Sequence, residues 1–335
     1  METSKLVKAG ACTLGRAFGY TPKVSIRLIE EAGSIEALFR LSERERDSLL
    51  GPFSRFRGSL SDAEVIRSGR ELDALRTKGI DFIALGETGY PQALAECPDC
   101  PAGLYVISPG SPEELFDDSP FISIVGTRDI SLYGQEWTRR IVFTLSQAQR
   151  KPVIVSGLAY GVDICAHRAA LDNAIDTIGV LAHGLDTIYP GHHRKTAELM
   201  LQHGGLVTEF TTGTNADKVN FIRRNRIVAG MADAVILVES AAHGGGLITT
   251  SIANSYSREV MAFPGPIGAK YSEGCNNLIR NNGATLITCA DDMMQTLGWE
   301  SAAEVQTARS KGIERQMFPD LTDAEQKVTD ALNDT

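Results

Sequence analysis

The sequence predicts an α/β fold in which helices cover both faces of a mostly parallel sheet. From residue 121 onward, short apolar runs alternate with segments of helical periodicity, a pattern typical of βαβ units. The runs are continuously apolar, as expected for strands that are buried on both faces. The clearest of them, Phe121–Val125, stops at Gly126 and is followed by a polar turn. The chain therefore reads as a doubly wound, Rossmann-like protein.

The same pattern sets the expected order of elements. Strands are expected at 121–125, 153–156, 177–182, 205–209, 234–239, 259–262 and 285–287. Helices are expected between them, at 131–149, 162–173, 194–203, 221–230, 247–257 and 276–282. Ligands of such sheets bind beyond the carboxyl ends of the strands, so the loops after these strands are where a site is expected.

Three domains are predicted. Residues 1–79 show apolar spacing of helical period and are expected to form a small helical domain of the SAM-like type. Residues 80–298, which open with a strand at 80–85 and a proline-rich connection, form the Rossmann-like domain. Residues 299–335 are polar; within them, 321–332 is amphipathic and begins with the capping box Thr322 to Glu325.

Composition restricts the function classes. The 335 residues contain 43% hydrophobic residues, enough for a sizeable core, and no apolar run long enough to span a membrane. Without a leader-like N-terminus, we expect a cytoplasmic protein. The six scattered cysteines suit a reducing compartment; Cys97 and Cys100 form a lone CxxC, for which two unrelated thiols are favoured over a zinc site. The net charge of −9 argues against nucleic-acid binding unless a local basic patch overrides it.

The turn after residues 121–125 is the first candidate anion site. Gly126 and Thr127 lead to Arg128, a fixed cation, and Ser131 is a good N-cap for the helix that follows. The N-terminus of a helix presents backbone N–H groups and a positive dipole end, which attract phosphate. Arg128 is therefore predicted to contact phosphate, with a salt bridge as the alternative.

Glycine-rich loops follow other predicted strands. Ser156, Gly157 and Gly161 follow one, and Gly245 lies in a run of three glycines after another; glycine lets a backbone approach a ligand closely. No GxGxxG occurs, so no dinucleotide cofactor is expected.

Two pairs of polar residues offer other chemistry. Asp163 and His167 are spaced for one helix face, where orienting loop 156–161 is favoured over acid–base catalysis. Asp186 and Glu239 could share a metal, but no further ligand is present, and no metal site is expected.

A basic cluster is hidden within the acidic total. It comprises Lys218, Phe221, Arg223, Arg224 and Arg226. All of these except Arg226, together with the neighbouring Asn225, are predicted to bind DNA. Phe221 would supply a stacking surface for a base, with a core position as its alternative. Successive helical positions point in different directions, so the arginines cannot all meet one ligand. Lys218, Phe221 and Arg224 are preferred for DNA, whereas Asn225 reads as a structural hydrogen-bonder and Arg226 as a structural residue.

Taken together, these blocks resemble the DNA-processing protein A (DprA/Smf) family over about residues 80–298. The matching blocks are Ile124 to Arg128 with Ser131 and Tyr133-Gly134, Ser156 to Asp163 with Ala166-His167, Gly184 to Asp186 with Tyr189-Pro190, Arg224 to Gly230, Leu247 to Thr249, Pro264-Gly265, Asn277 to Ile279 and Asn282 to Ala284.

The resemblance implies a non-enzymatic protein that binds single-stranded DNA, protects it during natural transformation and loads the recombinase RecA. It also implies a homodimer, and it relates residues 321–332 to the first helix of a C-terminal winged-helix domain. The alternative is a Rossmann-like enzyme of the nucleoside-monophosphate phosphoribohydrolase type, suggested by Glu239 with the glycines at 244–246, although that family's proline–glycine motif is missing.

Overall fold

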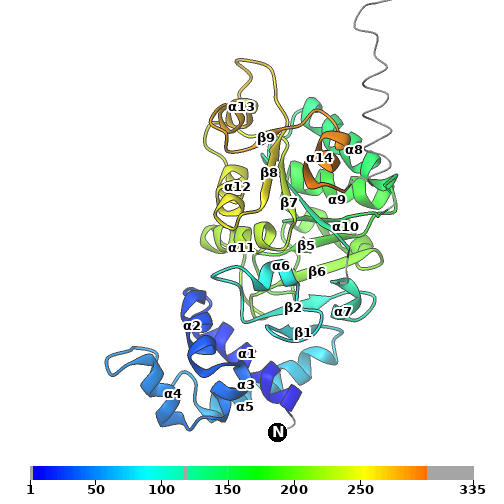
Figure 1. Ribbon diagram of the computed structural model, residues 1–335. Helices are drawn as coiled ribbons and strands as arrows, with labels where there is room; N and C mark the ends of the chain where they lie inside the picture. Colours follow the sequence, from blue (N-terminus) through cyan, green and yellow to red (C-terminus); the bar gives the residue numbers. More distant parts are fainter. Residues whose placement is uncertain (1–2, 117–118, 149, 300–335) are drawn as a thin grey trace, which may run out of the picture. The chain divides into compact units, whose positions relative to one another are not determined.

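The computed structural model describes residues 3–116, 119–148 and 150–299, and its centre is a nine-stranded sheet. The strand order is β1-β2-β6-β5-β4-β3-β7-β8-β9 (Figure 1). Every pairing from β6 through β9 is parallel, whereas the β1–β2 and β2–β6 pairings at one edge are antiparallel. The predicted α/β class with a mostly parallel sheet is confirmed.

The elements follow one another in strict alternation after β3. The strands are β1 (Asp81–Ala84), β2 (Gly103–Ile107), β3 (Phe121–Val125), β4 (Val153–Ser156), β5 (Thr177–Val180), β6 (Gly204–Thr208), β7 (Ala234–Leu237), β8 (Glu259–Ala262) and β9 (Thr285–Leu286). The helices of the sheet region are α6 (Gln92–Ala95), α7 (Pro112–Leu115), α8 (Leu132–Ser146), α9 (Val162–Asp172), η1 (Gly191–His193), α10 (Arg194–Met200), α11 (Lys218–Gly230), α12 (Gly245–Ser255) and α13 (Glu273–Arg280).

Helices cover the two faces of the sheet in two groups. Figure 1 shows α8, α9 and α10 together on one side and α11, α12 and α13 on the other. The central strands β3, β4 and β7 are fully buried, which explains their largely apolar sequences. The Oγ of Ser123 in β3 donates a hydrogen bond of 2.6 Å to the carbonyl of Val228 and so fastens α11 to the centre of the sheet.

Several boundaries differ from the sequence-based expectation by two or three residues, and one strand was not expected at all. Strand β2 lies inside the stretch predicted to be a proline-rich connection. It was not predicted because it has only five residues and lies between prolines. Helix α11 begins at Lys218, three residues earlier than predicted, because the side chain of Asp217 caps it by accepting the backbone N–H of Asn220 at 2.7 Å.

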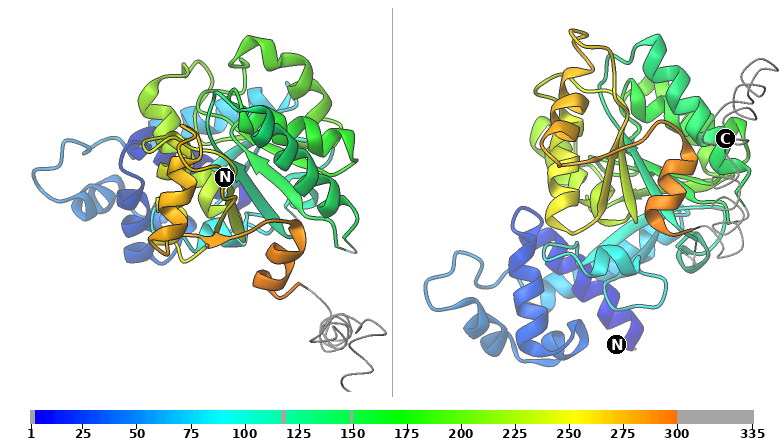
Figure 2. Two further views of the ribbon diagram at one scale, coloured as in Figure 1. Left: turned by 90° about the horizontal axis from the view of Figure 1, so that it is seen from above. Right: turned by 45° about the horizontal axis from the view of Figure 1, so that its top comes forward.

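Five helices precede the sheet: α1 (Thr3–Phe18), α2 (Pro22–Ala32), α3 (Ile35–Arg40), α4 (Glu43–Leu50) and α5 (Asp62–Arg76). They form a bundle beside β1 and β2 (Figure 2). Cys12 of α1 lies 3.2 Å from the hydroxyl of Tyr105 in β2, and bundle and sheet residues share one hydrophobic cluster. The predicted helical N-terminal region is confirmed, whereas the boundary at residue 79 stays a prediction.

Residues 291–335 form a unit separate from residues 1–290. Helix α14 (Ala290–Leu297) is its described element. The predicted amphipathic segment 321–332 lies outside the described residues. Among the helices that are described, none combines the length and apolarity needed to cross a bilayer.

A buried histidine links α9 to β5. The Oγ1 of Thr177 donates to the carbonyl of Ile154 at 2.9 Å, so it must accept the hydrogen bond from Nδ1 of His167 at 2.7 Å. The other ring nitrogen, Nε2, is buried without a partner in the described structure. Burial lowers the pKa of His167 to about 3, with the Arg224 guanidinium as a further cause. His167 therefore contacts β5, not loop 156–161 as expected.

This histidine makes stability pH-dependent. The unfolded chain protonates it near its ordinary pKa of about 6.5, whereas the folded chain does not, so its contribution is present above about pH 6.5 and falls as the pH drops toward 3. Between pH 7.5 and 5 the parent is expected to lose about 2 kcal/mol more unfolding free energy than His167→Asn. Urea unfolding at both pH values measures this; equal losses in the two proteins would contradict the assignment.

Candidate nucleic-acid interface

The candidate site lies where the strand order of the sheet reverses. Strand β3 has β4 on one side and β7 on the other. The helices that follow these two neighbours, α9 and α12, cover opposite faces of the sheet. Open α/β sheets bind ligands at such a point. A cavity of about 810 Å³ opens there. A Cβ on Gly246 would lie only 3.1 Å from the Cα of Gly126, so these two glycines allow the start of α12 to approach the end of β3.

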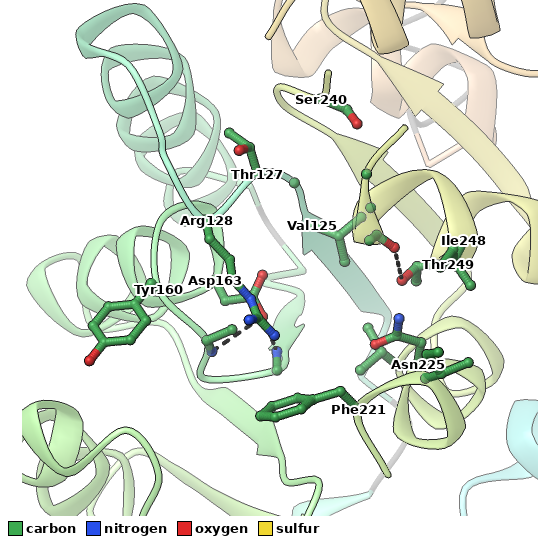
Figure 3. A pocket seen from close by; sticks show the side chains of 18 of the residues that line it. Val125, Thr127, Arg128, Tyr160, Asp163, Phe221, Asn225, Ser240, Ile248 and Thr249 are labelled. Atoms are coloured by element: carbon green, nitrogen blue, oxygen red, sulfur yellow. Dashed lines mark hydrogen bonds between the residues drawn. The ribbon is translucent and has the colours of Figure 1, made fainter. Parts of the chain in front are cut away.

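The cavity collects most of the predicted site residues from distant parts of the chain. Those that line it are Gly126, Thr127, Arg128, Gly157, Lys218, Phe221, Arg224, Asn225 and Gly245. Figure 3 shows Arg128, Phe221 and Asn225 around one opening. Arg128 comes from the loop after β3, and Phe221 and Asn225 come from successive turns of α11. A shared location is thus established for these residues, and contact with DNA stays a prediction.

The other four predicted residues do not line the cavity. The backbone N–H and Oγ of Ser131 both donate to the carboxylate of Glu239, at 2.8 and 2.5 Å, while the Oγ caps α8 as predicted. Ser156 is buried and donates to the carbonyl of Ile124. Gly161 has a positive φ of 77°, and a Cβ there would lie 2.1 Å from the carbonyl oxygen of Thr127. These three support the cavity loops from behind.

Arg223 points away from the cavity. Its guanidinium donates to the carbonyl of Gly19 in the helical bundle and to Oδ1 of Asn220, and it lies 3.8 Å from the carboxylate of Glu209. Arg226 pairs with the same buried Glu209 on its other oxygen and donates to the carbonyl of Asp99. Both arginines therefore hold elements together, the role expected for Arg226.

Phe221 contributes an aromatic ring to the cavity wall. The guanidinium of Arg128 lies 5.0 Å from its ring centroid, and that of Arg224 lies 5.9 Å away. The ring of Tyr189 approaches to 5.9 Å. Cations within about 6 Å of an aromatic face are attracted to it, so Phe221 holds Arg128 near the opening. Phe221 is half-buried, which decides against the alternative of a core phenylalanine.

Arg224 forms the floor of the cavity. Only 3% exposed, it donates to the carbonyl of Val180 at 2.7 Å. A Cβ on Gly157 would lie 1.6 Å from its Nη1, so only glycine fits there. Burial raises the pKa of the Asp163 carboxyl, and the nearby Arg224 opposes this rise. Asp163 accepts the N–H groups of Gly157 and Ala159, which confirms that it orients loop 156–161.

Three exposed cations surround the opening: Arg128, Lys218 and Lys270. None of them has an ion pair within the described ranges. Helix α12 adds its N-terminus, where the cap residue Gly244 offers no side chain to the first backbone N–H groups. The cavity is thus built to receive negative charge despite the acidic chain.

The carboxylates beside these cations have structural partners. Asp217 caps α11, and Asp129 accepts a hydrogen bond of 2.9 Å from the hydroxyl of Tyr271. Glu239, behind the cavity, is occupied by Ser131, and Asp186 accepts the N–H of Gly213 at 3.0 Å. The part of the chain that the structure describes contains no group of three or more potential metal ligands.

Among the cavity residues that were not predicted as site residues are Lys270, Tyr160 and Tyr189. Both tyrosines lie in loops that follow strands, and an aromatic residue in a glycine-rich loop was an available signal for them. Lys270 lies in the long segment between β8 and α13, and no motif marked it.

Comparison with known proteins agrees with this architecture. Residues 81–298 match the sequence profile of the family described as DNA recombination-mediator protein A. The chain is 37% identical to protein Smf of Synechocystis over 68% of its length, and 31% identical over 84% to a protein of Mycobacterium tuberculosis named putative DNA processing protein DprA. It spans 56% of the Synechocystis protein and 75% of the mycobacterial one.

Solved structures give the same result. The chain is similar to DNA processing protein A of Streptococcus pneumoniae, with a TM-score of 0.69 and 28% identity over 88% of this chain and 96% of that one. It is also similar to DNA processing protein A of Helicobacter pylori, described for its single-stranded DNA binding mode, with a TM-score of 0.57 and 28% identity over 64% of this chain and 95% of that one. The chain belongs to the DNA recombination-mediator protein A family.

Proposed function

We propose that this protein binds single-stranded DNA in the cavity at the end of β3 and acts there without catalysing a reaction. The observation that carries the proposal is that three exposed cations line one cavity together with the half-buried ring of Phe221, over which Arg128 lies. Binders of single strands combine a positive groove for phosphates with aromatic rings on which bases stack. The described mode of the H. pylori relative supports the same ligand.

In this proposal, Arg128, Lys218 and Lys270 hold phosphates with the N-terminus of α12, and Phe221 contacts a base. Asn225, which faces the cavity (Figure 3), supplies a neutral polar contact. Phosphate contacts carry no sequence information, and stacking accepts every base. The binding is therefore general for single strands and steeply weakened by salt.

The finer role follows from the family description, that of a recombination mediator. We infer that the protein is a cytoplasmic homodimer that protects incoming strands during natural transformation and loads RecA on them. The test is the DNA-dependent ATPase activity of RecA on strands covered with single-strand-binding protein. The parent should shorten the lag before hydrolysis, and a variant that has lost DNA binding should not.

Nucleotide hydrolysis is the competing function. It would require Glu239 as an acid–base group, but this carboxylate is buried and accepts both hydrogen bonds that Ser131 donates. That engagement favours a structural role, in which Glu239 holds the start of α8. Release of free base from AMP or CMP by the purified protein would reverse this preference.

Replacing Arg128 with alanine is expected to weaken binding of a labelled oligothymidylate at least about tenfold at low salt, since a charged hydrogen bond contributes about 1.5–3 kcal/mol. The slope of log K against log salt should also fall by about 0.7. Fluorescence anisotropy at several salt concentrations measures both. Arg140→Ala, which removes an exposed arginine of α8 outside the cavity, is the control. Unchanged binding by Arg128→Ala would contradict the site.

Replacing Phe221 with alanine tests the stacking surface separately from charge. Loss of one stacked base, about 1–3 kcal/mol, should weaken binding about 5- to 150-fold while the salt slope stays that of the parent. The control is Phe143→Ala, which truncates an exposed phenylalanine of α8 away from the cavity. A changed salt slope with little loss of affinity would show that Phe221 acts through Arg128 and not by stacking.

A further inference from the structure

A second cavity, of about 640 Å³, lies between the helical bundle and the β1 edge of the sheet. We call it the bundle-edge cavity. Its lining comes from α1, α5, the start of β1 and the start of α7, and Figure 1 shows the three helices gathered around β1. It shares no lining residue with the cavity at the end of β3. Small-molecule sites are typically cavities of about 300–1,000 Å³ and often lie between domains.

Part of the lining of the bundle-edge cavity is aliphatic. Ile66 of α5 is 48% exposed although it is apolar. Leu72, also from α5, is half-buried, and Ile80 and Pro112 complete this part of the lining. Covering exposed apolar surface is favourable, so an occupant with an apolar or ring-shaped body would be stabilised here.

Four cations line the same cavity: Lys5 and Lys8 from α1, and Arg70 and Arg76 from α5. The two helices pack against each other. Lys5, Arg70 and Arg76 are exposed, and none of these three has an ion pair within the described ranges. Lys8 lies 3.7 Å from the carboxylate of Glu87. Ammonium and guanidinium groups from two neighbouring helices are thus available to an anion, and phosphate is the anion that they bind best.

Three carboxylates also line the bundle-edge cavity: Asp73 of α5, Asp81 of β1 and Glu113 of α7. They form no ion pair among the residues described. A plain anion would be repelled by them, so a well-matched ligand carries hydrogen-bond donors beside its anionic group. The hydroxyls of a ribose are such donors, and acidic side chains accept them in nucleotide sites.

We propose that the bundle-edge cavity binds a nucleoside phosphate. The lysines and arginines hold the phosphates, the carboxylates accept hydrogen bonds from the ribose or from an amino group of the base, and the base covers Ile66. An amino acid also combines an acid with donors, but its single carboxylate would leave most of the four cations unused. The proposal does not depend on the DNA site, because the two cavities are lined by different residues.

The test uses N-methylanthraniloyl-ADP as a fluorescent probe. Phosphates could also enter the cavity at the end of β3, so the titrations are made with the full chain carrying Arg128→Ala/Phe221→Ala. We call this protein the background. It isolates the bundle-edge cavity from the proposed DNA site. Unlabelled ADP and inorganic pyrophosphate then compete with the probe.

The variant adds Arg70→Ala/Arg76→Ala to the background. The matched control adds Arg67→Ala/Lys78→Ala, which removes two exposed cations from α5 and the turn after it, neither of which lines the cavity. Thermal unfolding without ligand checks that all three proteins are folded.

Background and control are expected to bind the probe equally, and the variant at least about tenfold more weakly, because charged hydrogen bonds to phosphate are lost. ADP should displace the probe at least about tenfold better than pyrophosphate, since pyrophosphate lacks the ribose and the base. ADP should also raise the unfolding temperature of the background more than that of the variant. Without the Arg128 and Phe221 substitutions, Arg70→Ala/Arg76→Ala should bind oligothymidylate as the parent does.

Absence of probe binding by the background, or equal binding by variant and control, would overturn the nucleotide site. Displacement by pyrophosphate as effective as by ADP would also overturn it, because the cavity would then hold phosphate alone. Failure of the parent to bind oligothymidylate would instead contradict the proposed function and leave the bundle-edge cavity as it stands.

Discussion

The buried guanidinium of Arg224 is the interaction on which the site depends. It comes from α11 on one side of the sheet, bonds the last carbonyl of β5, and lies against the backbone of Gly157 at the end of β4. Its charge faces Asp163, which in turn holds loop 156–161. A buried cation without these partners would be strongly destabilising. One side chain thus fixes the mutual positions of α11, β4, β5 and α9, and with them the cavity wall.

Charge in this protein is organised locally, against an acidic total. The chain carries a net charge of −9, yet the carboxylates near the cavity are committed to caps and hydrogen bonds. Asp217 caps α11, Asp129 accepts from Tyr271, and Asp163 orients a loop. Arg128, Lys218 and Lys270 are left facing solvent at the opening. The field that a phosphate meets depends on such nearby groups more than on the sum over the chain.

The helical bundle is attached to the sheet region at points that bear on the same helix. Arg223 and Arg226 of α11 share the buried carboxylate of Glu209, and Arg223 also bonds Gly19 of the bundle. Arginines that point in different directions from one helix therefore serve two tasks. Arg224 supports the cavity, while its neighbours join α11 to β6 and to the bundle. The spacing that made the run look like one basic patch is what separates these tasks around the helix.

The sequence by itself determined the class of fold, the order of strands and helices from β3 onward, and the loops that carry the site. These follow from local periodicity and from glycines at strand ends, which neighbouring residues specify. It also singled out Arg128, Phe221 and Arg224. Strand β2 was not predicted, because five residues between prolines show too little periodicity to be distinguished from a connection.

Only the tertiary structure decided how the basic residues are used. It turned Arg223 toward Gly19 and Tyr20, placed Ser131 and Ser156 behind the cavity, and brought Lys270 into the opening from an unmarked loop. Each of these outcomes depends on partners more than 30 residues away along the chain. Side-chain direction at the surface of a helix or loop is set by such distant contacts, which local sequence does not encode.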